Sequence, residues 1–190
     1  MTDYCDMNCD ECRSTVCQTG KILEAECYEP VKSAENWGEL PNHVVDEVVE
    51  DHEIAAAVAL AKKVYMADEA PDQPQAGIDY CMGQMNDPEY IGLLRIYTAM
   101  DGDRIAGMAA TRSSGTHLAW LYIDGAYQKQ GVGTALFERV LRDDPMNQMT
   151  VQAAPSATGF YLKKGFLKKD GLIEVDGQYI TPMVYKRIKK

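Results

Sequence analysis

The feature that most constrains the fold of this chain is a short turn that contains two glycines, Gln128-Lys129-Gln130-Gly131-Val132-Gly133. The segment before it, 117–124, is rich in aromatic and branched residues, which is typical of a buried strand. The segment after it, 133–142, carries an apolar stripe with helical spacing. The chain must therefore pass from a strand through a tight turn directly into a helix.

A turn of this kind has two interpretations. At the start of a helix the first backbone N–H groups have no acceptor within the helix, and the helix dipole adds partial positive charge. Glycine lets a phosphate approach these groups because no side chain stands in the way. The turn is therefore either a plain strand-to-helix connection or the cradle of a pyrophosphate, and its spacing alone does not distinguish the two.

The remaining pattern predicts one mixed α/β domain over residues 44–190. Two helices precede a hairpin of strands, and after the strand, turn and helix described above comes a second strand and helix, followed by two final strands. The expected helices are 51–67, capped by Asp51, 78–85 and 156–164, capped by Ser156, and the expected strands are 94–100, 104–112, 150–153, 166–175 and 179–188.

Residues 1–43 form a separate cysteine-rich segment and linker. Five of the six cysteines precede residue 28, and the first residues of the chain do not resemble a secretory signal. The spacing of Cys9, Cys12, Cys17 and Cys27 would allow four thiolates to surround a tetrahedral zinc ion, and free thiols are the alternative. A zinc ion held this way would be structural, because four sulfurs fill its coordination shell.

Charge and hydropathy argue against two classes of partner. The net charge is −10 and no dense cluster of basic residues is present, whereas phosphate contacts supply most of the affinity of nucleic-acid-binding proteins. No stretch approaches the length of apolar sequence that a transmembrane helix needs. We therefore expect a cytoplasmic protein with no nucleic-acid partner and no membrane attachment, in which an exposed sheet edge would allow a homodimer.

Two motifs resemble those of the GCN5-related N-acetyltransferase (GNAT) superfamily. The Q-x-x-G-x-G at 128–133 resembles the acetyl-CoA motif of that family, and Ala157-x-x-Phe160-Tyr161-x-Lys163-x-Gly165-Phe166 resembles its second signature. The resemblance implies a mostly antiparallel central sheet with one parallel, splayed strand pair, flanked by helices. It also implies transfer of an acetyl group from acetyl-CoA to a primary amine. A Rossmann-type site fits less well because its third glycine is absent.

The resemblance further implies where acetyl-CoA would bind. Main-chain groups of Leu121, Tyr122 and Ile123 would pair with the pantetheine arm. The loop that follows would bind the pyrophosphate, and it consists of Gln128, Lys129, Gln130, Gly131, Val132, Gly133 and Thr134. Ala154 stands where the family often has an asparagine that contacts the cofactor, and Gly125 replaces a common proline. These departures affect side-chain contacts and leave the main-chain site intact.

Tyr161 and His117 are the candidate catalytic residues. In the family, the tyrosine at the position of Tyr161 protonates the departing thiolate, and a phenol can donate a proton while neutral at pH 7. His117 is the candidate base, and even spacing places it on the same face of the strand as Ile123 unless a bulge intervenes. A core tyrosine and a surface histidine are the alternatives, and Glu53 and Asp124 are weaker substitutes for the base.

The acceptor side of the site is expected along the loop from Ala67 to Pro74. This loop carries Asp68, Glu69 and Asp72, which would favour a small, cationic amine. The expected reaction is direct attack of the amine on the thioester while both substrates are bound. The alternative is a non-catalytic protein, either an acyl-CoA binder or an adaptor with a zinc knuckle.

Overall fold

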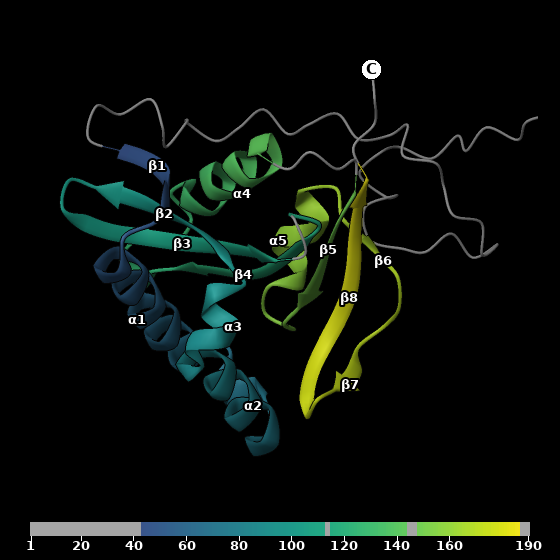
Figure 1. The fold of residues 1–190 in the computed structure, drawn as a ribbon. Coiled ribbons are helices and arrows are strands. Elements are labelled where there is room, and N and C mark those ends of the chain that lie inside the picture. The colour runs from purple at the N-terminus through teal and green to yellow at the C-terminus, as the bar shows by residue number, and fades with distance from the viewer. Residues whose placement is uncertain (1–42, 113–114, 144–147, 187–190) are drawn as a thin grey trace, which may run out of the picture.

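The computed structural model describes residues 43–112, 115–143 and 148–186, which form a sheet with helices on both faces (Figure 1). The four cysteines of the expected zinc site lie outside these residues. No described helix has both the length and the apolar character needed to cross a membrane. The elements are β1 (His43–Val48), α1 (Asp51–Asp68), η2 (Ala70–Asp72), α2 (Gln75–Asn86), α3 (Pro88–Gly92), β2 (Arg95–Asp101), β3 (Arg104–Arg112), β4 (His117–Ile123), η3 (Gly125–Tyr127), α4 (Val132–Asp143), β5 (Gln148–Ala153), α5 (Thr158–Lys163), β6 (Leu167–Lys168), β7 (Ile173–Val175) and β8 (Gln178–Lys186).

The sheet has the strand order β1-β2-β3-β4-β5-β8-β6, and β7 pairs with β8 beside this path. Neighbouring strands run antiparallel except β4 and β5, which are parallel. This arrangement confirms the predicted fold class, a mostly antiparallel mixed sheet with one parallel pair. A parallel pair needs a crossover connection, and α4 supplies it.

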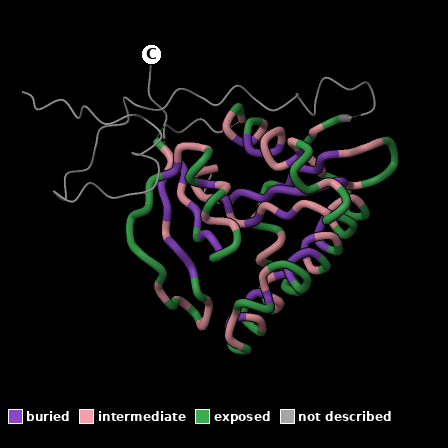
Figure 2. The backbone as a smooth tube through the Cα atoms, turned by 180° about the vertical axis from the view of Figure 1, so that it is seen from behind, coloured by how far each residue is buried: buried purple, intermediate pink, exposed green. Residues whose placement is uncertain are grey.

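Helices α1, α2 and α3 cover one face of the sheet, and α4 and α5 cover the other (Figure 1). Two apolar cores result. Leu136 and Phe137 of α4 pack with Met149 on one face, whereas Ala61 and Tyr65 of α1 belong to the core of the other. Figure 2 shows the buried backbone concentrated in the central strands and along the inner sides of the helices.

Strand β1 was not predicted, because residues 43–48 have no alternation of apolar and polar residues. It is an edge strand, and the Val44 side chain is 54% exposed. Besides its pairing with β2, it is held by Arg139 of α4, whose guanidinium donates to the Val45 carbonyl at 2.6 Å and to the Asp46 carboxylate at 3.0 Å. A side chain nearly a hundred residues away therefore helps to place this strand.

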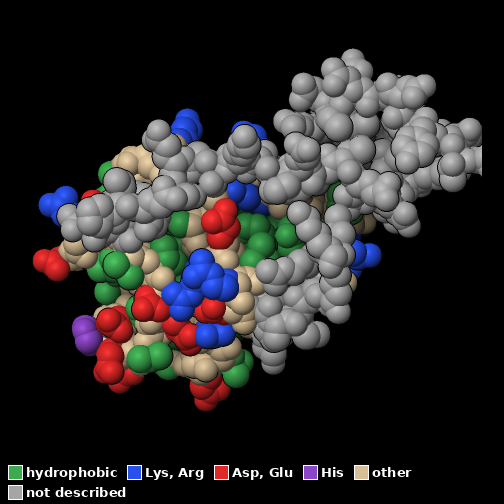
Figure 3. All heavy atoms as spheres, turned by 90° about the horizontal axis from the view of Figure 1, so that it is seen from above, with side chains coloured by type: hydrophobic (Ala, Val, Ile, Leu, Met, Phe, Trp, Pro, Cys, Tyr) green, Lys and Arg blue, Asp and Glu red, His purple; other side chains and the backbone are tan. Residues whose placement is uncertain are grey.

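Charged side chains of both signs meet around this edge. Arg139 also pairs with Asp143 at 3.0 Å, Arg95 pairs with Glu47, and both guanidinium groups lie over the ring of Tyr97. Figure 3 shows Lys and Arg side chains among Asp and Glu side chains on the face seen from above. Arg95 and Arg139 are therefore both neutralised by carboxylates at this edge.

Three element boundaries differ from the sequence prediction. The expected strand over 166–175 is two short strands, β6 and β7, because the side chain of Asp170 accepts a hydrogen bond from the Gly171 amide and turns the chain between them. Helix α1 is capped by Glu50 rather than Asp51, through a capping box with Glu53. Helix α5 begins at Thr158, so a cap at Ser156 was wrong.

A bulge in β4 changes which way its residues point. The register with β3 skips one residue at Ala119. Leu118 and Ile123 therefore pack with the core under α4, whereas Trp120 packs with the core under α1 and α2. Because neighbouring residues of a strand alternate, His117 points away from the α4 side. The prediction placed His117 and Ile123 on one face unless a bulge intervenes, and because this bulge is present the two residues lie on opposite faces.

Candidate functional site

The turn between β4 and α4 presents unpaired backbone amides. Lys129 and Gly131 have left-handed backbone conformations, with φ of 61° and 91°. The first backbone hydrogen bond of the helix runs from the Ala135 amide to the Gly131 carbonyl at 3.0 Å. The amides of Val132, Gly133 and Thr134 precede that bond and have no acceptor within the helix. The turn therefore fits a pyrophosphate.

Two glutamine side chains brace this turn. The Gln128 amide group donates to the Asp68 carboxylate at 2.6 Å and to the Ile123 carbonyl at 3.3 Å. The Gln130 amide group donates to the Ala126 carbonyl at 2.6 Å. Since both side chains form hydrogen bonds within the protein, an anion at this turn would bind to its main-chain amides.

Beside the turn, β4 and β5 separate. They pair only through His117 with Thr150 and Leu118 with Val151. Leu121, Tyr122 and Ile123 lie beyond the last pair. A pocket occupies the place where the strands diverge, and residues of both strands line it. The sheet is therefore open where a thioester arm would lie between two strands.

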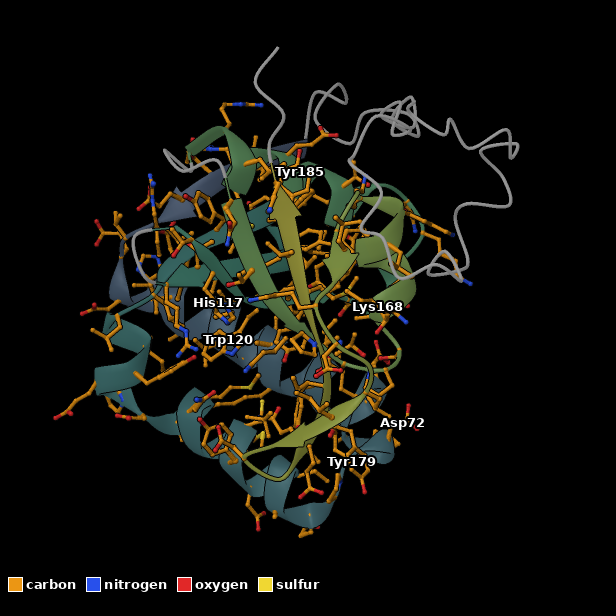
Figure 4. The ribbon with its side chains drawn as sticks, turned by 90° about the vertical axis from the view of Figure 1, so that its right-hand side faces the viewer. Asp72, His117, Trp120, Lys168, Tyr179 and Tyr185 are labelled. Atoms are coloured by element: carbon orange, nitrogen blue, oxygen red, sulfur yellow. The ribbon has the colours of Figure 1, made fainter. Side chains whose placement is uncertain are left out.

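The rest of the pocket wall comes from the helices on the α1 side, from α5, from the end of β3 and from β8 with the turn before it. Gln73, which follows η2, closes one side, because its side-chain amide donates to the Tyr179 carbonyl at 3.0 Å and accepts from the Tyr179 amide at 2.7 Å. Nearby, a Cβ atom added to Gly77 would lie 2.5 Å from the Gly177 carbonyl oxygen, so α2 touches the turn between β7 and β8. Figure 4 shows Asp72 and Tyr179 close to each other at this junction. These contacts thus close one side of the pocket where the sheet is open.

Glu69 lies in this pocket, at the C-terminal end of α1. Burial, together with the neighbouring Asp68 carboxylate, raises the pKa of Glu69 to about 7, although the Tyr122 side chain donates a hydrogen bond to it. A carboxylate that exchanges a proton near neutral pH is suited to general base catalysis. The sequence reading placed Glu69 beside the acceptor but missed this role, because the burial comes from distant strands.

Tyr161 lines the same pocket from α5 and is 5% exposed. Its ring packs edge-on against Phe160 and Phe166. Burial, and to a lesser degree the Glu69 carboxylate, raises the pKa of Tyr161 well above its usual range. Within the described part of the chain its hydroxyl forms no hydrogen bond, so a buried donor is left for a bound group. Glu69 and Tyr161 therefore belong to one site.

His117 also lines the pocket, and it lies near Trp120 at the start of β4 (Figure 4). One of its ring nitrogens, Nδ1, is 2.9 Å from the Thr150 hydroxyl. Burial, with the positive charge of Arg112, lowers the pKa of His117 to about 4. The ring is therefore neutral at pH 7 and is a weaker base than the Glu69 carboxylate.

The other acidic candidates lie elsewhere. Asp124 pairs with Lys63 at 2.7 Å, and Glu53 belongs to the cap of α1. Asp68 holds the Gln128 side chain, and Asp72 is exposed on η2 outside the pocket. Of the three acids expected along the acceptor loop, only Glu69 lines the pocket.

Cys81 also lines the pocket, from α2, and it is buried. Burial and the Glu69 carboxylate raise the pKa of its thiol to about 12. The thiol is therefore protonated at neutral pH, and Cys81 is not an activated nucleophile.

Comparison with known families agrees with this geometry. A family model described as an acetyltransferase (GNAT) domain matches residues 69–187. A comparison with curated proteins found no match.

Solved structures of similar fold include a GCN5-related N-acetyltransferase from Rhodopseudomonas palustris, with 17% identity and a TM-score of 0.62 over 75% of this chain and 94% of that one. A PaiA N-acetyltransferase from Thermoplasma acidophilum in complex with coenzyme A has 14% identity and a TM-score of 0.59, over 75% and 99%. A spermidine N-acetyltransferase from Vibrio cholerae in complex with CoA and spermine has 15% identity and a TM-score of 0.54, over 77% and 96%.

Proposed function

Because this chain belongs to the GNAT acetyltransferase family, we propose that it transfers an acetyl group from acetyl-CoA to a small primary amine while both substrates are bound. The observation that carries this proposal is the enclosed pocket between the diverging strands β4 and β5, which brings Glu69 and Tyr161 together. One of these groups can accept a proton and the other can donate one, as aminolysis of a thioester requires.

The cofactor would lie along the main chain. The bare amides of Val132, Gly133 and Thr134 would receive the pyrophosphate, and the edge of β4 at Leu121–Ile123 would receive the pantetheine arm. The thioester would then enter the pocket at its Tyr161 end. Rigid strand and helix termini would hold the two substrates in contact, which supplies a large part of the rate enhancement.

Glu69 would act as the general base. An amine enters as its ammonium form, and the carboxylate attracts that charge and then takes one proton from nitrogen. The pKa of Glu69 near 7 leaves a large ionised fraction at neutral pH while keeping the group basic. His117 would orient the pocket wall through Thr150 rather than take the proton.

Tyr161 would act as the general acid. The nitrogen lone pair forms the new C–N bond, the C–S bond breaks, and the departing sulfur takes the hydroxyl proton of Tyr161. Glu69 passes the first ammonium proton to water before the attack and takes the second proton from nitrogen as the C–N bond forms. Glu69 then loses this second proton to water and the Tyr161 phenolate regains one, so both groups return to their starting states. The balance is one amide, one thiol and one released proton for each ammonium consumed.

The test is release of free thiol from acetyl-CoA with a panel of small primary amines, alongside direct measurement of CoA binding. We expect turnover with at least one amine, and the Tyr161→Phe variant should bind CoA normally but turn over about 100-fold more slowly. Full activity of that variant would contradict the role of Tyr161. Absence of CoA binding or of turnover with every amine would contradict the proposed function.

A further inference from the structure

A second charge lies in the acceptor pocket and has no role in the chemistry above. Arg112, at the end of β3, lines the pocket together with Tyr80, Tyr90 and His117. The Arg112 guanidinium forms a hydrogen bond with the Tyr90 hydroxyl. Its charge also lowers the pKa of His117 and opposes the burial that raises the pKa of Tyr80. The half-buried Arg112 side chain therefore contributes positive charge to this pocket.

Among the described residues, no ion pair neutralises this guanidinium. Arg95 and Arg139 each pair with two carboxylates, whereas no carboxylate of the described residues lies within ion-pair distance of Arg112. Asp176, which also lines the pocket, is exposed and accepts a hydrogen bond from Tyr80. A guanidinium has five N–H donors, so most of those of Arg112 remain for a ligand.

Glu69 and Arg112 lie toward different ends of β4, because Arg112 pairs with His117 at the start of that strand, whereas Tyr122, which contacts Glu69, lies near its end. Glu69 acts on the pKa values of Tyr161 and Cys81, and it accepts a hydrogen bond from Tyr122. None of these residues is affected by Arg112, which acts on Tyr80, Tyr90 and His117. No ion pair joins Glu69 to Arg112. An acceptor that fills the pocket therefore meets a negative group at one end and a positive group at the other.

We propose that the acceptor is an amine that also carries a carboxylate, as amino acids do, and that Arg112 binds this carboxylate while the amine lies at Glu69. The inference rests on the proposed function, and it narrows the acceptor from amines in general to zwitterionic ones. The planar guanidinium fork matches a carboxylate in a way that no neutral side chain of the pocket does. A polyamine has no group for Arg112 and would place a second positive charge beside it.

The test compares acceptors that differ only by a carboxylate, such as lysine with cadaverine and 4-aminobutyrate with propylamine. The wild-type enzyme should favour the carboxylate-bearing member of at least one pair by about 10-fold or more in kcat/KM, the size expected for a charge-assisted hydrogen bond. In Arg112→Gln this ratio should fall to near one. The matched control is Arg104→Gln, at the exposed opposite end of β3, which should keep the wild-type ratio.

The outcomes separate this inference from the proposed function. Thiol release that is equal for both members of every pair, or faster with the carboxylate-free amines, would overturn the inference and leave acetyl transfer standing. An Arg112→Gln variant that keeps the carboxylate preference would overturn it as well. Failure of every amine to release thiol would overturn the proposed function and the inference together. The comparison of substrate pairs uses the wild-type protein, so it stands even if the variant does not fold.

Discussion

Replacing Glu69 with glutamine should stabilise the free protein at high pH and at the same time remove its activity. In the folded protein burial raises the pKa of Glu69 from 4.5 to about 7, so the folded state holds this proton more tightly than the unfolded chain does. The stability that comes from this proton is fully present below pH 4.5. It is lost as the pH rises through 7, because the buried carboxyl must then ionise.

The size of the effect follows from the pKa. One pKa unit corresponds to about 1.4 kcal/mol, so well above pH 7 ionisation of Glu69 removes about 3 kcal/mol of stability. Glutamine can still accept the hydrogen bond from Tyr122, but it does not ionise. Relative to wild type, Glu69→Gln should therefore gain about 3 kcal/mol in free energy of unfolding between pH 4 and pH 8.5.

Urea unfolding at several pH values measures the stability, and thiol release measures the activity. In the wild type kcat/KM should rise about tenfold between pH 6 and pH 8, as Glu69 ionises, whereas the variant should lose this rise together with about 100-fold of its activity. Glu174→Gln, at an exposed position of β7, is the control for both measurements. The reasoning is refuted if Glu69→Gln keeps the wild-type pH profile, or if its stability relative to wild type does not increase with pH.

Three further changes test other parts of the structure. His117→Asn should leave the pH dependence of kcat/KM between pH 6 and 9 intact, because the histidine pKa lies near 4, and loss of that dependence would instead make His117 the base. Gly77→Ala should cost about 2 kcal/mol of stability and reduce turnover, since the new methyl group would strike the turn before β8. Gly83→Ala on the same helix has open space and should be neutral or stabilising, so equal effects of the two changes would contradict the proposed junction. Arg139→Met should lower the free energy of unfolding by about 1–3 kcal/mol through lost contacts to β1, while Arg142→Met, at an exposed position of the same helix, should change it by less than about 0.5 kcal/mol.

The parts of the site that depend on local sequence were predictable. The strand over 117–123, the turn at Gly131 and the helix after it follow from residues that are adjacent in the chain, and the structure places each of them as expected. The position of Tyr161 on a short helix was predictable because the motif around it is local, whereas its catalytic role stays a prediction. Such features need only local spacing and the conformational freedom of glycine.

The features that depend on distant contacts were not predictable. Glu69 stands in the sequence as one of several acids in a loop, and only its burial against β4 separates it from Asp68 and Asp72. Nothing in the sequence distinguishes Arg112 from other residues at strand ends, because Tyr80 and Tyr90, which lie beside it in the fold, are distant from it in the chain. The face of β4 on which His117 lies depends on a bulge, and the residues of the strand do not predict that bulge. In each case the missing information was which segments pack together.

The central claim is that the backbone of the turn at Gly131 binds the cofactor, and calorimetric titration of the protein with CoA tests it most directly. Gly131→Ala places a side chain at φ 91°, which L-residues rarely adopt, and should weaken CoA binding by about 1–2 kcal/mol, or roughly tenfold in Kd. Gly102→Ala carries a similar backbone strain at φ 57°, in the turn between β2 and β3, and should leave the Kd unchanged. A wild-type protein that does not bind CoA, or a Gly131→Ala variant that binds it as tightly as the wild type, would contradict the account.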